Sequence, residues 1–383
     1  MSKVSIVNCQ DYLQEHVDEA IRQSLELLGG LQNIIKPGHK VLIKVNALMA
    51  VDPEDAITTH PAVVAAIIKE VKKCGGVPLV GDSPGNPQAS YHKAMEKCGF
   101  AQACEEHGGK LTSFQESGIA DIPSPSQNKS ISTVRIAKVV LEADVIINVP
   151  KLKTHGWTLY TGAIKNMFGV VPGFFKSKYH LATPQPNEFA KTLVDILEIT
   201  KPQIHIMDAV VGMEGAGPSA GKKRHLETIA ASFDPVALDA VCSTAIGYKP
   251  FAIDTTKIAH QRGLGKGQLV NIEIVGQPLS AIVKKDWQHS ASTYNLTRYI
   301  PPWLNFMFEP VTKLLRVDPV IIQEKCTQCQ VCVRSCPVKT IHNKDKKVII
   351  DHSKCIMCYC CHELCPEKAI ELRRSWLARR MGI

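Results

Sequence analysis

The 383-residue sequence contains no stretch of eighteen consecutive uncharged apolar residues, so it lacks a segment that could cross a lipid bilayer. Aromatic residues make up only 6% of the chain, and no basic stripe is interleaved with them. A nucleic-acid-binding surface is therefore not expected, because such surfaces combine clustered basic charge with a recognised reader motif. The N-terminal segment also lacks the apolar core of a secretory signal, which predicts a cytoplasmic protein with reduced thiols.

Two glycine-rich segments lack nucleotide-binding signatures. In the segment 212–224, Gly221 and Lys222 are followed by Lys223 rather than by serine or threonine, so this segment is not a Walker phosphate loop. The segment 263–268 follows a helix-like stretch, and its third glycine is misplaced for a dinucleotide fingerprint. Neither segment therefore predicts a nucleotide cofactor.

The C-terminal region, by contrast, contains a doubled cysteine run. The run Cys-x2-Cys-x2-Cys-x3-Cys-Pro begins at Cys326 and is repeated 29 residues later, at Cys355. Zinc sites usually have two cysteine or histidine pairs separated by a longer loop, and disulfides are not expected in a reducing compartment. The pattern is typical of two 4Fe-4S clusters, each of which takes its fourth thiolate from the other run. The expected ligands are Cys326, Cys329, Cys332 and Cys365 for cluster 1, and Cys336, Cys355, Cys358 and Cys361 for cluster 2.

The segment from Val320 to Leu372 resembles the bacterial-type two-cluster ferredoxins. Residues 313–383 contain 14 Lys and Arg against 7 Asp and Glu, which is +7 of the net charge of +9. Part of this excess offsets the negative charge of the clusters, and the rest is expected to attract an acidic redox partner such as a ferredoxin or flavodoxin. Cys360, an additional thiol within the second run, is interpreted as a bystander rather than a ligand.

Residues 1–282 alternate short apolar runs with amphipathic ones. This alternation predicts an α/β domain, in one or two lobes, with a mostly parallel sheet flanked by helices. A small α+β two-cluster ferredoxin domain is expected at 320–372, after a packed linker at 283–319 and before a basic tail at 373–383. The aromatic stretch 303–308 leaves contact with a membrane surface open, although packing against the protein is the simpler interpretation. Strands are expected at 4–8, 40–45, 77–81, 110–114, 133–136, 145–149, 203–208, 228–232 and 270–275, and helices at 12–28, 61–74, 91–98, 189–200, 235–247 and 254–262.

The densest group of polar residues follows the expected strand 145–149. Parallel sheets bind their ligands at the carboxyl ends of their strands, and glycines in the segment 148–180 let the backbone approach a ligand closely. We interpret this segment as an anion-binding pocket, in which lysines bind a carboxylate or phosphate and histidines transfer protons; a solvated basic loop is the alternative. The residues assigned are His155, Lys165 and His180 as catalytic groups, and Lys151, Lys153 and Asn166 as anion-binding groups.

Three other segments are expected to contribute to this pocket. Asp82 and Ser83 follow a strand and could contact a ligand, although a plain turn uses the same residue types. Asp208 and Glu214 could supply a carboxylate to a substrate or metal, with turn formation as an equal alternative. Lys44 lies near the end of an apolar strand, where a lysine needs an anionic partner.

The segments 58–85, 148–173 and 207–221 resemble the family known as domain of unknown function 362. Members of that family often carry a C-terminal two-cluster ferredoxin, as this sequence does. The resemblance implies an α/β fold for the N-terminal part, but it implies little about the reaction.

The order His155, Lys165 and His180 is similar, more distantly, to the cofactor segment of lactate-racemase-type enzymes. That similarity implies Lys165 as the tether of a nickel-pincer nucleotide, His180 as a nickel ligand and His155 as an acid-base group. The ferredoxin module departs from this pattern, because racemisation is redox-neutral.

The leading functional hypothesis is an iron-sulfur oxidoreductase, in which two 4Fe-4S clusters transfer electrons to or from an anionic substrate or cofactor bound by the α/β domain. One alternative is a non-catalytic electron-transfer or accessory subunit. The other is a nickel-pincer-dependent, racemase-like enzyme with structural clusters.

Overall fold

The computed structural model of the chain describes residues 1–85, 90–126, 130–173, 175–294, 316–375 and 380. Most of the expected linker, including the aromatic stretch 303–308, lies outside the described residues, and so does most of the expected basic tail. In the part of the chain that is described, no helix is long and apolar enough to cross a membrane.

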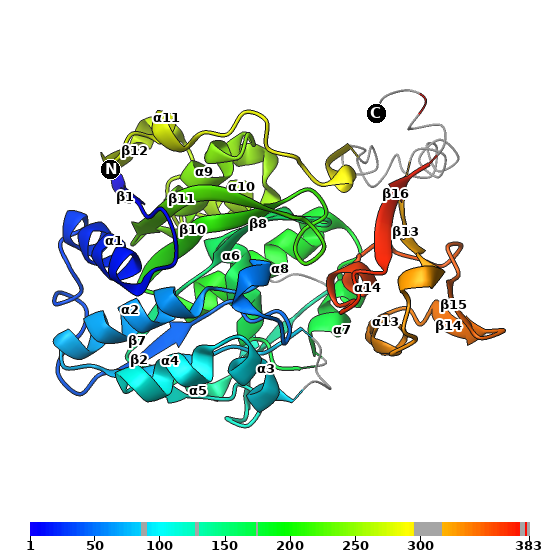
Figure 1. Ribbon diagram of the computed structural model, residues 1–383, viewed down its shortest axis with the longest axis horizontal. Helices are drawn as coiled ribbons and strands as arrows, with labels where there is room; N and C mark the ends of the chain where they lie inside the picture. The colour runs from blue at the N-terminus through cyan, green and yellow to red at the C-terminus, as the bar shows by residue number, and fades with distance from the viewer. Residues whose placement is uncertain (86–89, 127–129, 174, 295–315, 376–379, 381–383) are drawn as a thin grey trace.

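Ten strands of the described residues form one sheet at the centre of the α/β part (Figure 1). Its main path runs β12-β1-β11-β10-β7-β2-β3-β4, and β8 and β9 extend from β10. Neighbouring strands from β10 to β4 are parallel, while β11 is antiparallel to both β1 and β10. The strands are β1 (Ser2–Asn8), β2 (Lys40–Lys44), β3 (Val77–Gly81), β4 (Lys110–Leu111), β7 (Val145–Asn148), β8 (Lys151–His155), β9 (Leu159–Thr161), β10 (Ile204–Glu214), β11 (Lys222–Ser232) and β12 (Ile272–Gly276).

Helices cover both faces of this sheet, which confirms the expected fold class. In β2, Val41 and Ile43 pack in one apolar cluster with α1 and α2, whereas Leu42 belongs to a second cluster with α8. This division follows from strand geometry, because successive side chains point to opposite faces. A separate pair of strands, β5 (Ile119–Pro123) and β6 (Thr133–Ala137), lies outside the main sheet. The helices are α1 (Gln14–Leu27), α2 (Pro61–Lys73), α3 (Tyr91–Lys97), α4 (Phe100–His107), α5 (Lys138–Leu141), α6 (Ala163–Asn166), α7 (Phe175–Ala182), α8 (Pro186–Thr200), α9 (Pro235–Ala245), α10 (Asp254–Gln261) and α11 (Leu279–Ile282).

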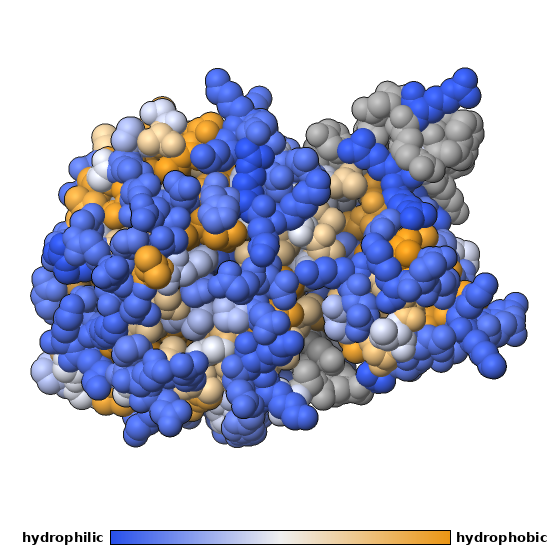
Figure 2. All heavy atoms as spheres, in the orientation of Figure 1, coloured by the Kyte–Doolittle hydropathy of each residue, from blue (hydrophilic) through white to orange (hydrophobic). Residues whose placement is uncertain are grey.

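The C-terminal part is a small domain of short antiparallel strands and short helices. Strand β13 (Val317–Ile321) pairs with β16 (Ile370–Arg374), and β14 (Ile341–Lys344) pairs with β15 (Lys347–Ile350). Figure 1 shows the β14–β15 hairpin projecting away from the α/β part, and Figure 2 shows hydrophilic residues covering its end. The helices of this domain are α13 (Val331–Ser335) and α14 (Cys360–Glu363).

Helix α14 and the turn before it join the two parts of the molecule. Cys358, Tyr359 and Cys360 belong to the same buried apolar cluster as Trp157 of the α/β part. Gly156 lies at this contact, and a Cβ atom there would come within 3.1 Å of both Leu372 and Tyr359. The second cysteine run is therefore packed against the α/β part.

Two local expectations differ from the structure. The polar segment after β7, for which a solvated basic loop is the alternative to a pocket, begins with the buried strand β8, which pairs with β10 and β9. The expected strand at 203–208 continues to Glu214 and forms a long antiparallel pair with β11, so Lys222 and Lys223 lie in a strand.

Candidate functional site

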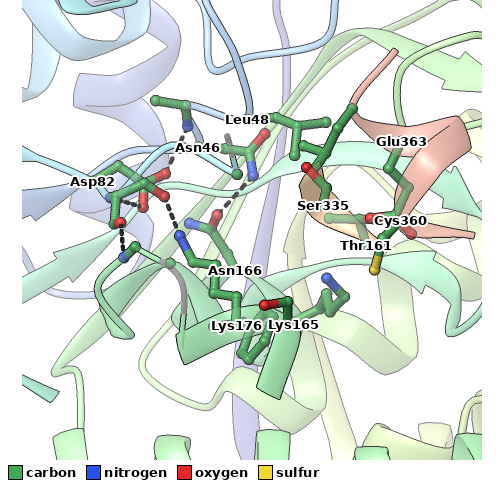
Figure 3. A pocket seen from close by; sticks show the side chains of 18 of the residues that line it. Asn46, Leu48, Asp82, Thr161, Lys165, Asn166, Lys176, Ser335, Cys360 and Glu363 are labelled. Atoms are coloured by element: carbon green, nitrogen blue, oxygen red, sulfur yellow. Dashed lines mark hydrogen bonds between the residues drawn. The ribbon is translucent and has the colours of Figure 1, made fainter. Parts of the chain in front are cut away.

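A cavity lies between the α/β part and the C-terminal domain (Figure 3). It encloses about 830 Å³ of empty space, counting the part that opens to solvent. One wall comes from the carboxyl ends of β2 and β3 and from the segment 161–180. The opposite wall comes from α13 and α14 and includes Ser335, Cys360 and Glu363. The site is thus where a parallel sheet is expected to bind ligands, but it is completed by the C-terminal domain.

An ion pair between Lys44, the last residue of β2, and Asp82, which follows β3, forms the floor of the cavity. These strands are parallel neighbours, so their last residues lie side by side. Lys44 Nζ is 2.9 Å from Asp82 Oδ1 and also donates to Asn166 Oδ1 at 3.3 Å. Asp82 Oδ2 accepts a hydrogen bond from the Ala47 amide at 2.7 Å. Burial lowers the pKa of Lys44, while Asp82 acts in the opposite direction, so the charge of Lys44 is already matched within the protein.

A chain of side-chain amides extends from this floor to Lys153. Asn166 donates to Asn148 Oδ1 at 2.8 Å and accepts from Asn46 Nδ2 at 3.0 Å. Lys153 Nζ donates to Asn46 Oδ1 at 2.8 Å and to the Ile57 carbonyl at 2.6 Å. Burial, with help from neighbouring lysines, lowers the pKa of Lys153 to about 7. Lys153 thus hydrogen-bonds to Asn46 but does not itself line the cavity.

Lys165 and Lys176 line the cavity from α6 and α7. Within the described residues, Lys165 Nζ has no hydrogen-bond or ion-pair partner, and it lies 5.3 Å from the centre of the Phe168 ring. Figure 3 shows Lys165 on the α6 side of the cavity, across from Cys360 and Glu363. Burial lowers the pKa of Lys165. Lys176 Nζ donates to the carbonyl oxygens of Ser83 and Pro84, and burial lowers its pKa to about 7.

His180 and Thr161 add two buried polar groups to the same wall. The His180 ring stacks on Phe189 at 4.4 Å and lies 4.7 Å from the Trp157 ring. Burial lowers the pKa of His180 to about 3, so its ring is neutral at pH 7. Neither His180 Nδ1 nor Thr161 Oγ1 has a hydrogen-bond partner among the described residues. Buried polar atoms without partners are rare in folded proteins, so both atoms are available to a ligand in the cavity.

His155 connects β8 to the C-terminal domain instead of lining the cavity. Its Nδ1 accepts hydrogen bonds from the amides of Trp157 at 2.9 Å and Thr158 at 3.3 Å. The proton of the neutral ring is therefore on Nε2, which lies 3.2 Å from Glu363 Oε1 but not in hydrogen-bonding geometry. Burial lowers the pKa of His155 well below its ordinary value.

The remaining residues of the expected pocket lie elsewhere. Lys151 Nζ is 2.9 Å from Asp208 Oδ2 and donates to the hydroxyl of Tyr12 at 2.5 Å, on a part of the sheet that does not line the cavity. Glu214 pairs with Arg224 at 3.0 Å, also away from the cavity. The structure thus brings together Lys44, Asp82, Ser83, Lys165, Asn166 and His180 of the assigned residues.

Sequence reasoning missed Lys176 and Arg334. Lys176 belongs to the polar segment that was singled out, but nothing in its spacing distinguishes it from Lys178. Arg334 lies between two cysteines of the first run, and no pattern in the sequence indicates that it lines a cavity shared with the α/β part.

The cysteines of the C-terminal domain form two groups. Cys326, Cys329, Cys332 and Cys365 line one largely apolar cavity of about 340 Å³. Burial, with the nearby thiols of Cys358 and Cys336, raises the pKa of Cys355, and burial and four neighbouring cysteines raise that of Cys361. In the described part of the chain, no three His, Cys, Asp or Glu side chains are arranged to hold a single metal ion.

The two groups differ in exposure. Cys329 is exposed, and Cys326 and Cys332 are half-buried. Cys365, the fourth member of the first group, is 9% exposed. In the second group, Cys358 and Cys361 are 7% and 8% exposed, and Cys336 and Cys355 are half-buried. The cavity between the domains is next to this second group, because Cys360 precedes Cys361 and Ser335 precedes Cys336 on its wall.

Comparison with known protein families gives two matches. Residues 41–244 match the domain of unknown function DUF362, and residues 318–366 match the 4Fe-4S dicluster domain. A thylakoid-associated protein of the cyanobacterium Synechocystis is 34% identical over 273 residues, which is 69% of this chain and 80% of the relative.

Two solved structures have a similar arrangement at low sequence identity. The lactate racemase apoprotein from Thermoanaerobacterium thermosaccharolyticum has a TM-score of 0.42 and 14% identity over 64% of this chain. A protein from Thermotoga maritima has a TM-score of 0.39 and 12% identity over 67% of this chain. The chain spans only 57% and 60% of these two proteins. The sequence matches are sufficient to place the protein: it belongs to the DUF362 family and carries a C-terminal 4Fe-4S ferredoxin-type domain.

Proposed function

We propose that the protein is an iron-sulfur oxidoreductase in which the buried cluster, cluster 2, exchanges electrons with an anionic substrate or cofactor in the cavity between the domains. The observation that carries this proposal is the shared wall: Cys360 and Ser335, the sequence neighbours of two expected cluster ligands, line the same cavity as Lys165. A ligand held by Lys165 lies beside the second cysteine group.

The cysteine groups also suggest a direction for the electrons. When bound, two 4Fe-4S clusters supply and accept electrons one at a time. The group that contains Cys329 reaches the surface, whereas Cys358 of the second group is packed against the α/β part. Electrons from an external carrier therefore enter at cluster 1 and leave at cluster 2. An acidic carrier, such as a ferredoxin or flavodoxin, is the partner we propose for the exposed side.

The side chains of the α/β part bind and orient the ligand in this proposal. The ammonium group of Lys165 pairs with the anionic group of the ligand, since it has no other partner in the described structure. The hydroxyl of Thr161 and the neutral ring of His180 hydrogen-bond to the same ligand. The Lys44–Asp82 ion pair holds the floor rigid and is not itself available for binding.

Anaerobic purification followed by metal analysis and electron paramagnetic resonance tests this function. We expect about eight irons per chain and two reducible clusters, as two 4Fe-4S groups require. The signal of one cluster should change when a carboxylate or phosphate is added, and Lys165→Gln should abolish that change. Lys249→Gln, which alters an exposed lysine away from the cavity, is the control.

Two results would contradict the proposal. Clusters that cannot be reduced, together with bound nickel, would favour the racemase-like alternative. Reducible clusters that respond to no anion would favour an electron-transfer subunit without a substrate of its own.

A further inference from the structure

The cavity contains more positive than negative charge. Lys44 and Asp82 neutralise each other at 2.9 Å, so they add no net charge. The other residues contribute three basic side chains and one carboxyl group, which gives a formal surplus of two positive charges when all four are ionised. These other charged residues on the wall are Lys165, Lys176, Arg334 and Glu363.

None of the three cations is paired with a carboxylate in the described structure. Lys165 has no polar partner there, and Lys176 donates only to carbonyl oxygens. Arg334 donates to the carbonyl oxygen of Cys329 at 3.1 Å through Nη2, which leaves its other nitrogens available. Carbonyl oxygens satisfy hydrogen bonds but do not neutralise charge. Lys165 and Lys176 are half-buried and Arg334 is exposed. Holding an unmatched cation partly away from water is costly, so a bound anion stabilises the two lysines.

We infer that the ligand of this cavity is an organic dianion, a dicarboxylate or a phosphate monoester, which bridges the two domains. The inference rests on the proposed function, and it specifies the charge of the ligand and the residues that bind the ligand. Lys165 and Lys176 belong to the α/β part, whereas Arg334 belongs to α13 of the ferredoxin-type domain. An arginine can contact a carboxylate or phosphate with two parallel hydrogen bonds, so Arg334 supplies an orienting contact from the second domain.

Two neutral groups add to the same site. His180 and Thr161 are 5% and 4% exposed, and the His180 Nδ1 and Thr161 Oγ1 atoms have no partner within the described residues. Both atoms can donate to an oxygen of the ligand, since the His180 ring is neutral and a hydroxyl can rotate. The cavity thus offers positive charge to two anionic groups and hydrogen-bond donors to their oxygens. Neither a hydrocarbon nor a cation could make these interactions.

Binding measurements on the anaerobic, cluster-loaded protein test this inference. Calorimetry at fixed ionic strength compares succinate and glycerol 3-phosphate with butyrate, which has a single carboxylate. We expect at least one dianion to bind about tenfold more tightly than butyrate, because each well-formed charge contact contributes at least that factor. Lys165→Gln and Arg334→Gln should each weaken dianion binding about tenfold or more, whereas Lys249→Gln should not. Iron content shows that each variant is folded and loaded.

Hydrogen exchange supplies a second readout, independent of affinity. A bridging dianion should slow amide exchange in both α7 and α13, and butyrate should not slow exchange in α13. Equal affinity for mono- and dianions, or slower amide exchange confined to the α/β part, would contradict a bridging dianion as the ligand. Neither result would contradict the proposed function. Binding of none of the three probes, combined with cluster signals that respond to no anion, would overturn both.

Discussion

Single lysines differ in what balances their charge, and this difference separates structural lysines from ligand-binding ones. Lys44 and Lys151 each lie 2.9 Å from a buried carboxylate. Lys153 is hydrogen-bonded only to neutral oxygens. Lys165, with no polar partner in the structure as described, faces the cavity. Removing the first two would leave a buried carboxylate unpaired, whereas removing Lys165 would not.

Lys153 should make stability depend on pH. Its pKa is lowered to about 7 from 10.5 by burial. Between these values the unfolded chain binds a proton that the folded chain does not, so the free energy of unfolding rises with pH across this range. Lys153→Met should reduce the rise in urea midpoint between pH 7 and pH 9.5, while Lys249→Met should not. An unchanged slope in Lys153→Met would show that Lys153 is protonated in the folded protein.

Cys360 should not be a cluster ligand. Its thiol lines the cavity between the domains, and it falls outside the spacing of the second run. Cys360→Ser should therefore keep the full iron content, whereas Cys361→Ser should lose about four irons, the content of one cluster. Iron analysis of the two variants, purified side by side without oxygen, measures this. Loss of iron in Cys360→Ser would reassign the ligand.

Residue identity alone indicated lysines that need partners, but not which partners they have. Lys44 and Asp82 are adjacent because β2 and β3 are parallel neighbours, and this pairing could be expected from the order of the strands. The contact between Lys44 and Asn166, 122 positions apart, depends on how α6 packs. Arg334 reaches the cavity only because the second domain docks there.

Among the secondary-structure elements, β8 shows why the sequence predicts the role of the polar segment 148–180 only in part. Its sequence alternates, and Lys151, Lys153 and His155 lie on one face of the strand, as strand geometry requires. Charged residues at alternate positions usually indicate an exposed strand face, so the sequence predicts an anion-binding pocket here but leaves a solvated basic loop as the alternative. All five residues of β8 are buried, because the face with the charges is covered by Tyr12, Asn46 and α14.

The β14–β15 hairpin is the element most exposed beside the first cysteine group. Its turn carries Lys344, Lys346 and Lys347 against a single acidic residue, Asp345, and all four are exposed. Gln328 of the first cysteine run donates to the Lys346 carbonyl at 2.8 Å, which ties the turn to the loop of cluster 1. We therefore expect the proposed acidic electron carrier to contact this turn.

Charge reversal of this hairpin tests the partner. Replacing its three lysines with glutamate should slow reduction by an acidic ferredoxin about tenfold at low salt, because electrostatic steering raises association rates by at least that factor. Reduction by the small reductant dithionite should not slow to a comparable extent. Stopped-flow absorbance at two salt concentrations measures both rates. Equal slowing with both reductants would point to damage to the cluster and not to lost docking.

The whole molecule joins two parts that the sequence identifies separately. Their contacts link residues far apart in the chain: His362 Nε2 lies 3.0 Å from the carbonyl oxygen of Ala216, and Lys368 lies 3.5 Å from Asp55. Apolar periodicity predicted the α/β class and cysteine spacing predicted the ferredoxin-type domain, because both are local patterns. The cavity between them arises from docking, which no local pattern encodes.

The most direct test of the account is a redox titration of both clusters with and without a dianion. A bound anion favours the oxidised, less negative state of a nearby cluster, so it lowers that cluster's reduction potential. We predict that succinate or glycerol 3-phosphate lowers the potential of one cluster, leaves the other nearly unchanged, and has no effect in Lys165→Gln. Saturating ligand that shifts neither potential, or shifts both equally in wild type and Lys165→Gln, would contradict a binding site beside cluster 2.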